Sequence, residues 1–143
     1  MFVKLNDNLR IGAMEFSLDL RKNQLDEIEK ILNEELIELG VANVVLLDLA
    51  GNVIANLDNG ETTHDVYSLA ALAAGNFGAV SAMANLIGEQ EFSLLFHKGE
   101  TESIHFSKVN QDLLLLTIFG KGVSLGFLRL KVSEAVKKIE ALF

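Results

Sequence analysis

The spacing of apolar and polar positions along the chain predicts its secondary structure. Strict alternation over residues 14–20 predicts a half-buried strand. Apolar residues spaced three and four apart predict amphipathic helices over 25–39 and 125–142. Short apolar runs bounded by turn residues predict five further strands, at 43–49, 52–57, 91–97, 101–109 and 112–119. Together with a central helix the predicted order is strand, helix, two strands, helix, three strands, helix.

The central stretch, residues 66–87, is apolar or small at almost every position. At about 100° per residue its bulky side chains gather on one face, which we expect to pack on the sheet together with Asn76. These bulky residues are Leu69, Leu72, Val80, Met83 and Ile87. The opposite face carries small residues, namely Ala71, Ala74, Gly75, Gly78 and Ala82.

A helix that is apolar all round must be covered on every side. One sheet and two other helices leave little of this chain to cover the small face, so we expect a second copy or a partner protein there. Packing within the same fold is the alternative. A membrane span is disfavoured because Asn76 and Asn85 interrupt the segment and no cluster of Lys or Arg flanks it.

Length and charge narrow the class of protein. The 143 residues fit one domain, and we assign residues 1–20 to an N-terminal segment and residues 21–143 to the domain. The net charge of −8 disfavours nucleic acid and anionic membranes as partners. The chain has no Cys, and its first residues lack the features of a signal peptide. We therefore expect a cytoplasmic protein.

Candidate chemistry is sparse. The three histidines, His64, His97 and His105, show no metal-ligand spacing, and no nucleophile stands beside a base. We expect no catalytic residue, no metal and no cofactor, and hence no enzyme, although an enzyme or a small-ligand sensor stays open as an alternative. Arg129 is interpreted as a surface ion-pair residue. A solvated acidic face is expected on the first helix, at Glu27, Glu34, Glu35 and Glu38.

Four segments of the sequence, 68–76, 86–92, 96–99 and 124–130, resemble the bacterial mutual gliding protein B (MglB) family of the roadblock, or dynein light chain, superfamily. The resemblance covers residues 21–143. It implies an α/β (α+β) fold of roadblock type, in which a five-stranded antiparallel sheet has two helices on one face and one long helix on the other. The strand predicted over 14–20 would be an addition to that pattern.

The resemblance also implies a function. Members of this family dimerise through the long helix and the strand that follows it, which places Glu91, Phe92, Leu94 and Phe96 at a dimer interface. They regulate a small Ras-like GTPase, here an MglA-like protein, and promote GTP hydrolysis without an arginine finger, in polarity or gliding motility. Matching the motif places the GTPase on Gly78 and Ala82, and we extend that surface to Ala71, Ala74 and Gly75 of the same face. The alternative is a roadblock scaffold that tethers a GTPase or another complex.

Overall fold

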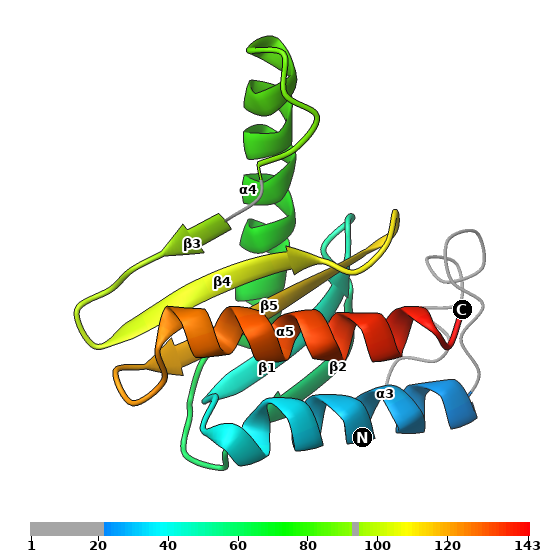
Figure 1. Ribbon diagram of the computed structural model, residues 1–143, viewed down its shortest axis with the longest axis vertical. Coiled ribbons are helices and arrows are strands. Elements are labelled where there is room, and N and C mark those ends of the chain that lie inside the picture. The colour runs from blue at the N-terminus through cyan, green and yellow to red at the C-terminus, as the bar shows by residue number, and fades with distance from the viewer. Residues whose placement is uncertain (1–21, 93–94) are drawn as a thin grey trace.

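The computed structural model describes residues 22–92 and 95–143 (Figure 1). The strand predicted over 14–20 and the predicted interface residue Leu94 lie outside these described residues. The helices are α3 (Lys22–Glu35), the short 3-10 turn η1 (Ile37–Leu39), α4 (Val66–Leu86) and α5 (Leu125–Glu140). The strands are β1 (Asn43–Asp48), β2 (Val53–Asp58), β3 (Leu95–His97), β4 (Glu102–Lys108) and β5 (Leu113–Gly120).

The five strands form one antiparallel sheet in the order β2-β1-β5-β4-β3. Helices α3 and α5 lie side by side across one face, and α4 stands on the other (Figure 1). The predicted fold class is therefore confirmed for the part of the chain that the structure describes.

The two strands at the middle of the sheet, β1 and β5, read as continuous apolar runs because both of their faces are covered. Val44 and Leu46 of β1 point into the core under α3 and α5. Val45 and Leu47 point into the core under α4. A strand buried on both faces has no polar side to alternate with, which explains the sequence pattern.

The first predicted helix is divided in two. Helix α3 ends at Glu35, and the chain tightens into η1 before Gly40 reverses it with a φ of +108°. A glycine in the left-handed region is the usual helix terminator, so the predicted end at Gly40 is confirmed although the last turn is not α-helical.

Glu35 differs from the solvated role expected for it. Its carboxylate lies 3.1 Å from the Lys131 ammonium and also contacts Lys138, both on α5. The hydrogen bonds from Lys138 and Lys131 hold the pKa of Glu35 below its usual value. Glu35 therefore joins α3 to α5, a pairing across two helices that helical periodicity within α3 does not reveal.

The turn between β1 and β2 brings Gly51 against α4. Gly51 has a φ of +94°, and a Cβ built on it would lie 3.1 Å from the Cα of Ala71. We expect Gly51→Ala to lower the free energy of unfolding, because a left-handed conformation costs a non-glycine residue about 1–2 kcal/mol and the new methyl group would also displace α4. Urea unfolding of the variant measures the loss.

Gly60→Ala is the matched control for this prediction. Gly60 has a φ of +86°, but nothing lies within 4 Å of its Cβ position. The Gly60→Ala variant should lose only the unfolding free energy that the left-handed backbone conformation costs. Equal losses in the two variants would contradict a close contact between the turn and α4.

Candidate protein interaction surface

Helix α4 packs on the sheet over its first half only, and its second half projects beyond the sheet (Figure 1). The residues that anchor it are Val66, Ala70, Ala73 and Phe77, all buried. The prediction that the bulky side chains face the sheet is wrong for Leu72, Met83 and Ile87, which are exposed. Asn76, expected on the same side, is exposed as well.

The side chains already on the sheet explain why small residues of α4 face it. The sheet presents large residues toward α4, among them Val45, Leu47 and Leu116, all fully or nearly fully buried. Interiors are close-packed, so Ala70 and Ala73 opposite those side chains let the helix approach. The spacing of four, three and four residues from Val66 to Phe77 is the sequence signal that would have identified this face.

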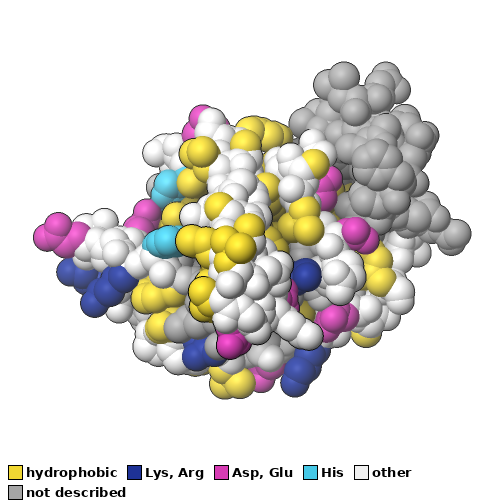
Figure 2. Space-filling view, turned by 90° about the horizontal axis from the view of Figure 1, so that it is seen from above, with side chains coloured by type: hydrophobic (Ala, Val, Ile, Leu, Met, Phe, Trp, Pro, Cys, Tyr) yellow, Lys and Arg dark blue, Asp and Glu magenta, His cyan; other side chains and the backbone are white. Residues whose placement is uncertain are grey.

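The large side chains of α4 form a stripe that faces solvent. Leu72, Ala79, Met83 and Leu86 recur at spacings of seven, four and three, which places them on one side of the helix. We call them the apolar stripe. Leu72, Met83 and Leu86 are 72%, 53% and 85% exposed, and Ile87 just beyond the helix is 70% exposed. Figure 2 looks down on α4 and shows hydrophobic side chains along it.

A second stripe of small residues runs beside the first. Ala71, Gly75, Gly78 and Ala82, at spacings of four, three and four, are all exposed, and we call them the small-residue stripe. A Cβ added at Gly75 or Gly78 would meet nothing within 4 Å. Ala74, predicted with this set, is half-buried and packs against the core beside the stripe. Another backbone can approach such a surface closely.

Helix α4 contains no charged residue over its 21 positions. Its nearest charge is Asp65, the N-cap, which accepts hydrogen bonds from the backbone N–H and the hydroxyl of Ser68. These hydrogen bonds hold the pKa of Asp65 below its usual value. Depletion of charge is typical of the core of a protein interface.

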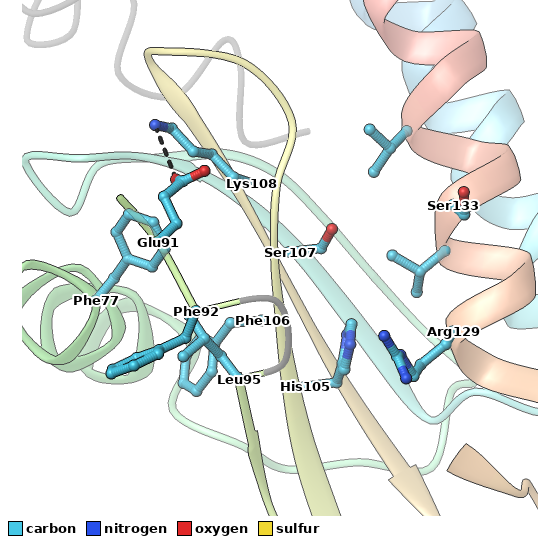
Figure 3. Close-up of a pocket in the computed structure, with 12 residues that line it drawn as sticks. Phe77, Glu91, Phe92, Leu95, His105, Phe106, Ser107, Lys108, Arg129 and Ser133 are labelled. Carbon is cyan, nitrogen blue, oxygen red and sulfur yellow. Dashed lines mark ion pairs between the residues drawn. The ribbon is translucent and has the colours of Figure 1, made fainter. Parts of the chain in front are cut away.

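Strand β3 and the residues before it form the second part of the surface. Within the described residues β3 pairs with β4 alone, so its outer edge is open. An open edge is a template for another strand. Glu91 lies before β3, with its carboxylate 3.2 Å from the Lys108 ammonium, and Phe92 is 39% exposed (Figure 3). Phe96 is half-buried and stacks on Phe119, with ring centroids 5.9 Å apart.

By length and composition α4 could cross a membrane. A span needs about 20 residues in contact with lipid or other protein through the whole bilayer. Here Val66, Ala70 and Ala73 are buried against the sheet of the same domain, so one face of the first half of α4 is not available to lipid. The exposed half alone is too short, which leaves a protein as the better cover.

No metal site was found in residues 22–92 and 95–143, where no group of three or more His, Asp or Glu side chains could hold an ion. The histidine nearest a carboxylate is His64, whose Nε2 lies 3.0 Å from Glu102. This pair bridges the start of α4 to β4. What the surface offers is shape and apolar area, with no reactive group on α4.

The five-stranded sheet, the two helices on one face and the long helix on the other define a small α+β domain in which one side of α4 is exposed. The sequence profile of the Roadblock/LC7 domain matches residues 27–119, and the chain belongs to this family. Its fold is similar to that of MglB from Myxococcus xanthus, with a TM-score of 0.78 and 30% identity over 88% of this chain and 94% of that one.

Two further structures show the same likeness. The gliding protein MglB from Thermus thermophilus has a TM-score of 0.80 and 28% identity over 88% of this chain and 95% of that one. An MglB described as having a tetrameric arrangement has a TM-score of 0.81 and 27% identity over 88% of this chain and 94% of that one. The chain is therefore an MglB-like member of the family. The search of curated protein sequences gave no match.

Proposed function

We propose that this protein is a homodimeric regulator of a small Ras-like GTPase of the MglA type, and that it accelerates GTP hydrolysis by repositioning the catalytic groups of the GTPase itself. The observation that carries the proposal is the side of α4 turned away from the sheet, which exposes two uncharged stripes next to each other. Two stripes provide for two different contacts. The apolar stripe, with the open edge of β3, takes the second protomer, and the small-residue stripe takes the GTPase.

The likeness to MglB supports this assignment of partners. The Thermus relative is described as a gliding protein, and another MglB as tetrameric. We infer that the present chain likewise assembles with itself and acts in polarity or motility, in the cytoplasm.

The small number of arginines fits a mechanism without an arginine finger. The chain has three, of which Arg10 and Arg21 lie outside the described residues. Arg129 lies on α5, across the sheet from α4. A group donated to the transferred phosphoryl must reach it directly, so substitution of Arg129 tests whether this residue is such a group.

A GTP-hydrolysis time course tests the proposal. The Ras-like GTPase encoded by the same organism is assayed with and without a stoichiometric amount of this protein. We expect acceleration of about tenfold or more, equivalent to about 1.4 kcal/mol of barrier. The Arg129→Gln variant should accelerate hydrolysis to the same extent as the unchanged protein.

The outcomes separate the two functions considered. Binding of the GTPase without acceleration would contradict the activator and leave a scaffold that tethers the GTPase. Failure to bind in either nucleotide state would contradict both. Loss of acceleration in Arg129→Gln, with binding retained, would contradict the mechanism without an arginine finger.

A further inference from the structure

A cavity of about 260 Å³ lies at the end of the sheet away from β2, between β4 and α5 (Figure 3). Its polar lining comes from His105, Ser107 and Lys108 of β4, from Arg129 and Ser133 of α5, and from Glu91 before β3. Its apolar lining comes from the rings of Phe77, Phe92 and Phe106 and from the side chains of Leu95, Val132 and Val136. Pockets for small ligands are typically about 300–1,000 Å³, so this one suits a ligand of few heavy atoms.

Arg129 contributes a positive charge to the lining of this cavity. Its guanidinium extends from α5 toward the ring of His105 (Figure 3). Among residues 22–92 and 95–143 no carboxylate forms an ion pair with it. The surface ion pair expected for Arg129 is therefore not found there. The nearby ammonium of Lys108 is already paired with Glu91.

His105 supplies an unpartnered polar atom to the same wall. The residue is 6% exposed, and its Nδ1 is buried without a hydrogen-bond partner. Burial and then the charge of Arg129 lower the pKa of His105 to about 4, so the imidazole is neutral at pH 7 and one ring nitrogen carries a proton. A buried polar group without a partner is uncommon and calls for an explanation.

We propose that this cavity binds the carboxylate of a small apolar organic acid or of a polypeptide chain end, with Arg129 as its charge partner and His105 as its hydrogen-bond donor. A carboxylate matches the two N–H groups that a guanidinium presents. Arg129 is the one cation of this lining without an ion pair among residues 22–92 and 95–143, so it can neutralise one negative charge. A doubly charged phosphate would leave a charge uncompensated beside aromatic rings. The apolar walls fit the carbon chain of the acid. The proposal rests on neither the dimer nor the GTPase.

Titrations of the full ¹⁵N-labelled chain, followed by NMR at constant ionic strength, test the site. The probes are butyrate for a free acid, N-acetyl-leucine for a chain end, N-acetyl-leucine amide as its uncharged counterpart, inorganic phosphate and chloride. We expect saturable shifts of the His105 ring nitrogens and of the Ser107 and Ser133 amides with a carboxylate. Arg129→Gln should weaken binding about tenfold or more. Lys137→Gln, which removes an exposed cation of the same helix outside the cavity, should not.

Each outcome decides something. Tighter binding of N-acetyl-leucine than of butyrate identifies a chain end as the ligand, and the reverse identifies a free acid. Shifts that stay linear and equal to those of chloride would overturn the site, as would equal affinity in Arg129→Gln. Saturable binding of phosphate or of the amide without binding of either carboxylate would overturn the ligand class.

Discussion

Gly78→Arg is expected to weaken binding of the GTPase about 100-fold or more, which is about 2.8 kcal/mol, while the protein stays folded and dimeric. Gly78 lies at the middle of the small-residue stripe, where a Cβ would meet nothing within 4 Å. The arginine side chain is therefore accommodated by the protomer itself and blocks only what approaches from outside. Titration of the variant against the GTP-loaded GTPase measures the loss, and Ala82→Arg should behave alike.

Gly126→Arg is the matched control. Gly126 is also a helical glycine with nothing within 4 Å of its Cβ position, but it lies on α5 across the sheet. It should leave GTPase binding unchanged. Unchanged affinity in Gly78→Arg would remove the GTPase from this stripe, and conversion of Gly78→Arg to a monomer would assign the stripe to the second protomer instead.

Leu72→Asp is expected to shift the protein from dimer to monomer. In a symmetric dimer each substitution acts twice, once from each protomer. Full burial of a leucine contributes about 1.5–3 kcal/mol, and a buried unpaired carboxylate adds a further penalty. The dimer dissociation constant should therefore rise about 100-fold or more. Sedimentation velocity over a range of concentrations measures it, and Met83→Asp on the same stripe should act in the same direction.

Leu130→Asp tests whether the effect belongs to α4. Leu130 is an exposed leucine like Leu72, with exposed fractions of 55% and 72%, but Leu130 lies on α5. The control should remain dimeric, and circular dichroism should show that all three variants are folded. A dimer that persists in both Leu72→Asp and Met83→Asp would exclude the apolar stripe from the interface between protomers.

The strands show which features of this fold can be read from local sequence. The strand predicted over 43–49 and its partner over 52–57 were placed within a residue or two of β1 and β2 because the turn residues between them terminate both. The edge strand was less well defined. Residues 91–97 were predicted as a strand, whereas β3 is described only for Leu95–His97. An edge strand has one neighbour, so its extent depends on β4 and on whatever pairs with its other side.

Helix α4 shows where local sequence was insufficient. Periodicity identified the helix, but it assigned the bulky side chains to the sheet and the small ones to the opposite face, whereas the two exposed stripes lie side by side. Hydrophobicity ranks Leu72 above Ala73 for burial, whereas a sheet already filled by Val45, Leu47 and Leu116 accepts the alanine and excludes the leucine. As a result, the apolar stripe, which we assign to the second protomer, was expected to face the sheet.

The sequence by itself determined the order of the elements within residues 22–143, the absence of charge on α4 and the resemblance to MglB. These features follow from residue types and short-range spacing, which do not depend on how distant segments of the chain are arranged. Only the tertiary structure decided which face of α4 meets solvent, that Glu35 pairs with α5, and that Arg129 and His105 share one cavity. Each depends on the volumes and charges that distant segments bring into contact, and close packing admits only the side chains that fit the space those segments leave.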